Sequence, residues 1–122
     1  VTCDADGHIT EILLYNNHLV GKLPNYQLHK LSRLQSLDVS NNALQGTLPN
    51  EMHTMTALTS LKIDHNYLLG PIPDTLGGLT NLAYFDFGYN LFTGTVPDSV
   101  LQLRDELGCH MQTKSFNANV RL

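Results

Sequence analysis

The sequence predicts an α/β solenoid, in which the short strands of a parallel sheet alternate with 3₁₀ or short helical turns. Two observations favour this fold. Asn, Gly and Pro recur in one fixed register through four copies, and the apolar residues around them follow a common pattern. Each copy is therefore expected to form one turn of a coil, and the four turns to share a continuous core.

The polar register is expected to build the scaffold. Each of the three residue types recurs at steps of 25, 24 and 24 residues. An Asn side chain can hydrogen-bond backbone groups in a buried turn, so the stacked Asn residues should form a ladder. Gly adopts backbone conformations barred to other residues, and Pro suits a strand edge or the start of a helical turn. The members are Asn17, Asn42, Asn66 and Asn90; Gly21, Gly46, Gly70 and Gly94; and Pro24, Pro49, Pro73 and Pro97.

The apolar pattern changes its period within each copy. In the second copy Leu37 and Val39 alternate as in a strand, whereas Met52 and Met55, after Pro49, lie three residues apart as in a helical turn. A single strand cannot bury its apolar side, so the copies must stack. The longer first step places one inserted residue in the stretch 25–27, on the connecting side of the coil.

Composition excludes several classes of function. The 122 residues indicate one domain, and 42% hydrophobic with 15% charged residues is typical of a folded globular chain. The net charge is −4 and the 7 Lys and Arg are scattered, so we expect no nucleic-acid partner. No apolar run approaches the roughly 20 residues of a membrane span, so we expect no membrane insertion by this segment.

Catalytic and metal-binding patterns are also missing from the sequence. No Ser lies in a G-x-S-x-G turn, and no Gly-rich phosphate loop occurs. No two of the six His stand four residues apart or at a zinc spacing with the two Cys. We therefore expect no enzymatic activity, no cofactor and no bound metal.

The pattern L-x-x-L-x-L-x-x-N-x-L-x-G-x-L-P over residues 9–104, with Ile or Val replacing the last Leu in two copies, resembles the plant-type leucine-rich repeat family. That family includes receptor-kinase ectodomains and polygalacturonase-inhibitor-like proteins. The resemblance implies a right-handed superhelix with its parallel sheet on the concave face and its 3₁₀ or short helical turns on the convex face. It also implies a second short strand near each Gly-x-x-Pro and an extracellular or cell-surface location.

The resemblance divides the chain into a partial N-terminal cap (1–8), four repeats (9–106) and a non-repeat C-terminal cap or tail (107–122). Residues 1–4 resemble the end of the family's cap, without its second Cys and aromatic-rich helix. Continuing the register beyond Arg104 would place polar Gln112 and Ser115 at a core and a ladder position. The chain begins at Val1 without a charged-then-apolar leader, and we interpret it as a segment of a longer protein.

The two cysteines are not expected to pair with each other. Cys3 precedes the first coil and Cys109 follows the fourth, so about four strand spacings, roughly 20 Å, separate them. A disulfide needs Cα atoms within about 7 Å. Cys109 is then either a buried, inert thiol or a link to another chain.

Outward strand residues should form columns on the concave face. In one column Asp38, Lys62 and Asp86 alternate in charge, which indicates either stabilising cross-strand pairing or a binding role. The tyrosines are either recognition residues or ordinary surface aromatics. The columns are Glu11, Ser36, Ser60, Tyr84; Leu13, Asp38, Lys62, Asp86; and Tyr15, Ser40, Asp64, Gly88. The candidate ligand-binding residues are Tyr15, Asp64, His65, Tyr84, Asp86 and Tyr89.

Two functions from different classes follow. The first is a recognition module that binds a protein, peptide or cell-wall glycan on the concave surface. The alternative is a structural array segment that spaces domains or self-associates through its solenoid ends, without a dedicated small ligand. An ice-binding face is a third interpretation, but Lys22 and Pro71 interrupt the column that Thr47 and Thr95 share.

Overall fold

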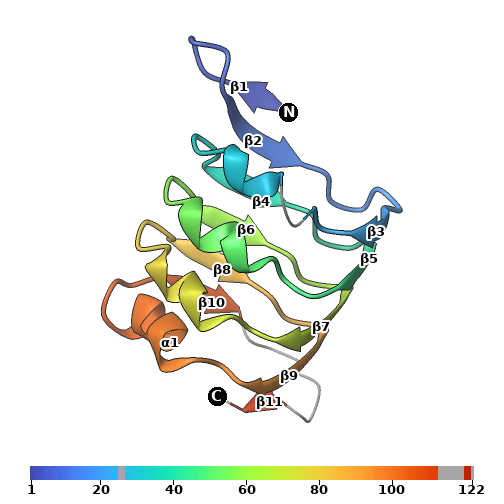
Figure 1. The fold of residues 1–122 in the computed structure, drawn as a ribbon, viewed down its shortest axis with the longest axis vertical. Coiled ribbons are helices and arrows are strands. Elements are labelled where there is room, and N and C mark those ends of the chain that lie inside the picture. Colours follow the sequence, from blue (N-terminus) through green and yellow to red (C-terminus); the bar gives the residue numbers. More distant parts are fainter. Residues whose placement is uncertain (25–26, 113–119, 122) are drawn as a thin grey trace.

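The computed structural model describes residues 1–24, 27–112 and 120–121, which form a stack of coils (Figure 1). Each repeat passes through a strand of one sheet, a strand of a second sheet, and a 3₁₀ or helical turn that leads to the next repeat. Residues 113–119 and 122 of the predicted C-terminal segment, Ser115 among them, lie outside the described residues. No described helix is long and apolar enough to cross a membrane.

The first sheet has six strands, in the order β1-β2-β4-β6-β8-β10. The short β1 (Thr2–Cys3) pairs antiparallel with β2, and all the other neighbours are parallel. Glu11 lies opposite Ser36, Ser36 opposite Ser60, and Ser60 opposite Tyr84, which confirms the predicted column. The repeat strands are β2 (Ile9–Leu13), β4 (Ser36–Asp38), β6 (Ser60–Lys62) and β8 (Tyr84–Asp86), and β10 (His110–Gln112) follows them.

Strand β10 continues this sheet beyond the four repeats. Met111 lies opposite Phe85 and packs against the core, and Gln112 pairs with Asp86. The repeat step therefore changes after the fourth repeat, because Met111 pairs with Phe85 at a step of 26 residues. The cause is a longer connection: the backbone N–H of Cys109 donates to the carbonyl of Leu103, six residues back, where the preceding repeat closes the same turn over three residues.

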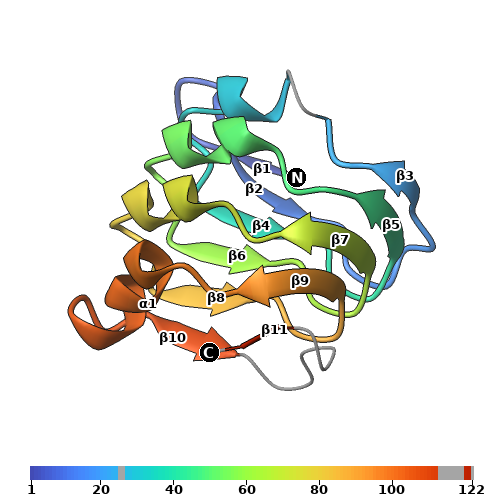
Figure 2. The ribbon, with the colours of Figure 1, turned by 60° about the horizontal axis from the view of Figure 1, so that its bottom comes forward.

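The second sheet and the helical turns form the other sides of the coil (Figure 2). The second sheet confirms the short strand expected near each Gly-x-x-Pro. Its strands, all parallel, are β3 (Val20–Lys22), β5 (Ala43–Gly46), β7 (Tyr67–Pro71), β9 (Leu91–Thr95) and β11 (Val120–Arg121). The turns are η1 (Leu28–Lys30), η2 (Asn50–Thr54), η3 (Asp74–Gly78) and the longer helix α1 (Asp98–Asp105).

One apolar core runs through the stack. In the third repeat Leu61, Ile63 and Leu68 have no exposed surface, because a neighbouring coil covers them on each side. Ile12 of the first repeat is only partly buried, because fewer apolar neighbours cover it. At the other end Cys109 is 2% exposed, and its burial raises the pKa of the thiol above its ordinary value. Cys3 is exposed, and both cysteines are free.

The predicted Asn ladder is present from the second repeat onward. Asn66 is 5% exposed; its Oδ1 accepts the backbone N–H of Leu44, and its amide donates to the carbonyls of Val39, Ile63 and Asp64. Asn42 and Asn90 make equivalent bonds to their own turn and to the preceding one. Asn17 is exposed at the start of the ladder, so its role in the scaffold is smaller than the sequence indicates.

Candidate functional site

Five of the six predicted binding residues gather at one end of the first sheet. Asp64 and His65 follow β6, Tyr84 and Asp86 are in β8, and Tyr89 follows β8. We call this group the β6–β8 cluster. Tyr15 follows β2 and is 59% exposed, but β4 separates its strand from β6, so the structure does not bring Tyr15 into the cluster.

His65 and Tyr89 are stacked, with their ring centroids 4.1 Å apart and their planes 17° from parallel. They occupy the same position in successive repeats, and both have a left-handed backbone, with φ of 52° and 51°. The two earlier repeats have Asn16 and Asn41 there, also with positive φ. Asn adopts this conformation with little strain and His is also enriched in it, whereas the bulky Tyr adopts it at a greater cost. The fourth repeat therefore carries backbone strain at Tyr89, whose ring completes a stacked, solvent-accessible pair with His65.

The two carboxylates of the cluster lie beside this ring pair. Asp64 is 8% exposed, and its Oδ2 lies 2.8 Å from His65 Nδ1. Asp86 Oδ1 accepts the backbone N–H of Gly88 at 3.3 Å. Partial burial and the nearby negative charge of Asp64 raise the pKa of Asp86 above its ordinary value, against the smaller opposing effect of Gly88, His65 and Lys62. The site thus holds two neighbouring carboxylates that are incompletely compensated.

A second ring pair adjoins the carboxylates. Tyr84 stacks on His110 of β10, with centroids 4.9 Å apart, and Lys62 Nζ lies 5.2 Å from the centre of the Tyr84 ring. Lys62 also approaches Asp38 at 4.0 Å, which supports the pairing interpretation of the charged column, although such an exposed pair contributes little stability. Sequence reasoning missed His110, because the alternation from Cys109 to Met111 is too short to indicate a strand and lies beyond the repeats.

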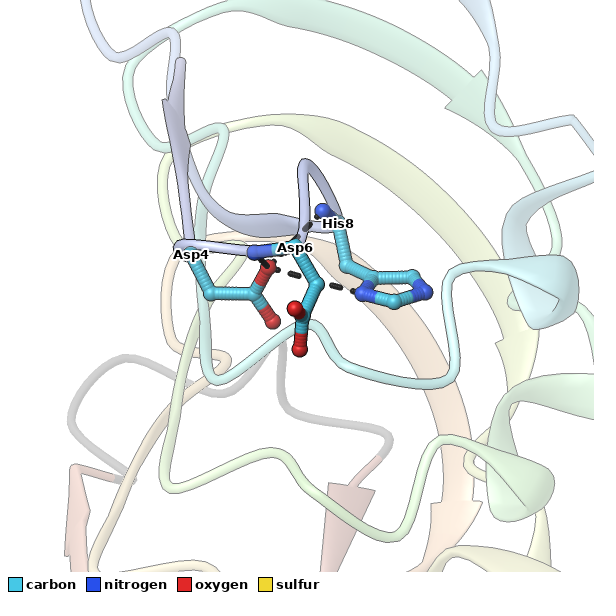
Figure 3. A group of neighbouring side chains, drawn as sticks. All are labelled: Asp4, Asp6 and His8. Carbon is cyan, nitrogen blue, oxygen red and sulfur yellow. Dashed lines mark hydrogen bonds and ion pairs between the residues drawn. The ribbon is translucent and has the colours of Figure 1, made fainter.

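The structure also brings Asp4, Asp6 and His8 together, a group that the sequence did not single out (Figure 3). Asp4 Oδ1 accepts the backbone N–H groups of Asp6 at 3.0 Å and His8 at 2.9 Å, and these donors help lower the pKa of Asp4. His8 Nδ1 lies 3.4 Å from the same oxygen. An Asp that bridges to amides two and four residues on is the usual way to tie a turn, and this accounts for the group.

A model of the leucine-rich repeat family matches residues 7–68, which is half of the chain. The chain therefore belongs to the leucine-rich repeat family, and its fold is the right-handed leucine-rich repeat solenoid with the first sheet on the concave face. Comparison with curated proteins gives no significant match.

Solved structures share the fold over most of this chain. The ectodomain of the receptor kinase SOBIR1 from Arabidopsis thaliana is 27% identical, with a TM-score of 0.81, over 92% of this chain and 59% of that one. The Arabidopsis receptor kinase HAESA, in complex with the peptide hormone IDA and the co-receptor SERK1, is 34% identical, with a TM-score of 0.74, over 92% and 17%. A plant ice-binding protein is 31% identical, with a TM-score of 0.66, over 85% and 31%. The chain spans less than two thirds of the length of each.

Proposed function

We propose that this chain is an extracellular recognition module that binds a segment of a protein or peptide on its concave face, through the β6–β8 cluster, and performs no chemistry itself. The observation that carries the proposal is the stacked pair of His65 and Tyr89. Strained backbone that the surrounding structure maintains is concentrated at functional sites, and here the strain serves an exposed aromatic surface rather than the core.

The comparisons support the same function. HAESA, of which 17% is similar to 92% of this chain, is a receptor kinase whose structure is in complex with a peptide hormone and a co-receptor. Tyrosine provides a large contact area with few rotatable bonds, which suits it to recognition surfaces. The likeness to the ectodomain of the receptor kinase SOBIR1 supports the extracellular location in this proposal.

The chain offers its own matched replacement for testing this proposal. Tyr89→Asn restores the residue type that the first two repeats carry at this position, so it removes the ring without introducing strain. Peptides selected from a random display library on the wild-type chain should bind the Tyr89→Asn variant at least tenfold more weakly, a loss of about 1.4 kcal/mol. Tyr15→Asn, in the first repeat, is the control and should leave binding unchanged.

Two results would contradict this function. One is that no peptide is enriched on the wild-type chain; the other is that selected peptides bind wild type and Tyr89→Asn equally. Pectin-derived oligosaccharides should be tested in parallel, because stacked rings also suit sugars. Binding of oligosaccharides without peptides would assign the surface to a cell-wall glycan instead.

One observation favours the alternative of a self-associating array. An apolar hollow of about 320 Å³ opens at the first coil, and its lining includes Ile12, Leu14, Leu19 and Val20. Val20 is 77% exposed. If these coils join end to end, the molecular mass from light scattering should rise with concentration, and Val20→Asp should abolish the rise. A monomer at every concentration would contradict the alternative.

A further inference from the structure

The concave face is strongly biased toward negative charge. Among the outward positions of β2, β4, β6 and β8 and the residues that directly follow these strands, the carboxylates are Glu11, Asp38, Asp64 and Asp86, and the only permanent cation is Lys62. A sheet face with this balance favours a ligand that carries positive charge, because complementary potentials accelerate encounter and disfavour anionic competitors.

Lys62 only partly compensates the negative charge at the far end of this face. Its ammonium group lies 4.0 Å from Asp38, toward the middle of the sheet, and 5.2 Å from the ring centre of Tyr84. Asp64 and Asp86 are left beside each other with a hydrogen bond to His65 and to the Gly88 backbone, respectively. The raised pKa of Asp86 is the physical consequence of that arrangement, since burial and Asp64 both oppose its ionisation.

The rings on either side of these carboxylates suit a flat cation. One stacked pair, His65 with Tyr89, and a second, Tyr84 with His110, frame the carboxylates. The contact of Lys62 with Tyr84 shows that a cation is already accommodated over one of these rings. A guanidinium group is planar, stacks on aromatic faces and binds carboxylates through paired N–H donors, which an ammonium group cannot reproduce.

Building on the proposed function, we propose that the bound segment presents an arginine side chain whose guanidinium is held by Asp64 and Asp86 between the two ring pairs. The bound guanidinium supplies the positive charge that compensates the two carboxylates. Arginine is preferred over lysine at this point, and an acidic or neutral residue there binds poorly.

The experiment uses peptides selected from the random display library on the full chain. The selected pool should be enriched in Arg at one fixed position. A selected peptide is then compared with the same peptide carrying citrulline, which keeps the shape of arginine and removes its charge, on wild type, Asp86→Asn and Glu11→Gln. Glu11→Gln is the matched control, because it removes one carboxylate from the same sheet face at the opposite end.

On wild type, the citrulline peptide should bind about tenfold more weakly, as expected for losing a charge-assisted hydrogen bond. Asp86→Asn should weaken the Arg peptide by a similar factor and leave the citrulline peptide unchanged, whereas Glu11→Gln should preserve the preference for Arg. Two results would overturn this inference while leaving the recognition function intact. One is that the selected peptides show no enriched Arg. The other is that replacing arginine by citrulline weakens binding to Asp86→Asn as much as it weakens binding to wild type. Failure to select any peptide would overturn both.

Discussion

At the residue scale, the buried asparagines hold successive repeats together through hydrogen bonds to the backbone. Each one satisfies backbone groups in two successive turns, so it links the repeats as well as closing its own turn. The sequence predicted this role from recurrence alone. It did not predict that Asn17 is peripheral, because recurrence alone treats the four Asn as equivalent, and the first coil has no preceding turn for its Asn to bond.

Asn66→Ala tests the ladder. The change removes an acceptor from Leu44 N–H and donors from the Val39 and Ile63 carbonyls, in a site that is 5% exposed. Leaving buried backbone groups unsatisfied should lower the free energy of unfolding by roughly 3 kcal/mol, measured by urea denaturation. The control is Asn17→Ala, expected to cost under about 0.5 kcal/mol. Equal losses in the two variants would contradict the ladder's role.

The raised pKa of Asp86 makes stability depend on pH. A carboxyl whose folded pKa lies above its unfolded value, here 3.8, stabilises the fold fully below that value and loses this contribution as pH rises through the folded pKa. Asp86→Asn should therefore unfold at a higher temperature than wild type at neutral pH, and the difference should vanish below about pH 3.8. Asn keeps an oxygen that can accept the Gly88 N–H.

Melting curves of wild type and Asp86→Asn across this pH range provide the measurement. An unchanged or lower melting temperature for Asp86→Asn at neutral pH would show that the ionised Asp86 carboxylate does not destabilise the fold. A variant that is more stable yet binds arginine peptides less well is the expected signature of a site maintained for binding.

At the element scale, the coils are held in register by close contact between successive helical turns. Ser99 Oγ in α1 donates to the Asp74 carbonyl in η3 at 2.7 Å, and Gly77 of η3 approaches the same serine. The sequence predicted these turns from apolar residues three apart. It did not predict that the fourth turn lengthens into a true α-helix, nor that the longer connection after it adds strand β10.

Two neighbouring glycines give a matched test of this packing. A Cβ at Gly77 would lie 2.6 Å from Ser99 Cβ and 2.7 Å from the Ser99 carbonyl oxygen, whereas at Gly78 it would meet open space. Gly77→Ala should lose about 2 kcal/mol of unfolding free energy through overpacking. Gly78→Ala should be neutral or gain up to about 1 kcal/mol, because it restricts the unfolded chain. Chemical denaturation of both variants measures these free energies. Equal stabilities of the two variants would contradict the close packing of η3 on α1.

The candidate site shows where sequence reasoning ends at this scale. The columns followed from strand alternation, so Tyr84 and Asp86 could be placed on one face. The stacking of His65 on Tyr89 could not, because it depends on the left-handed backbone that both residues adopt after their strands. His110 was missed because its strand lies beyond the repeats, at a step of 26 residues from Tyr84.

At the scale of the whole molecule, stability should be graded along the stack rather than uniform. Each coil contacts only its neighbours, so a coil at an end gains one interface where an inner coil gains two. The third repeat is fully buried at Leu61, Ile63 and Leu68, while the first opens into the apolar hollow beside Leu19 and Val20. The first coil should therefore open in fluctuations that leave the inner coils intact.

Native-state hydrogen exchange can measure this gradient on chemically equivalent amides. The backbone N–H groups of Leu19, Leu44 and Leu68 all donate to the Oδ1 of a ladder Asn, at 2.9, 3.0 and 3.0 Å. Because the three hydrogen bonds match, a difference in protection against exchange reports on the stability of the coil and not on the strength of the bond. Leu68 and Leu44 should exchange only with global unfolding, and Leu19 by a smaller opening at least tenfold faster, a difference of about 1.4 kcal/mol. Equal protection at all three would mean that the first coil unfolds only together with the rest, so that the open end carries no local weakness.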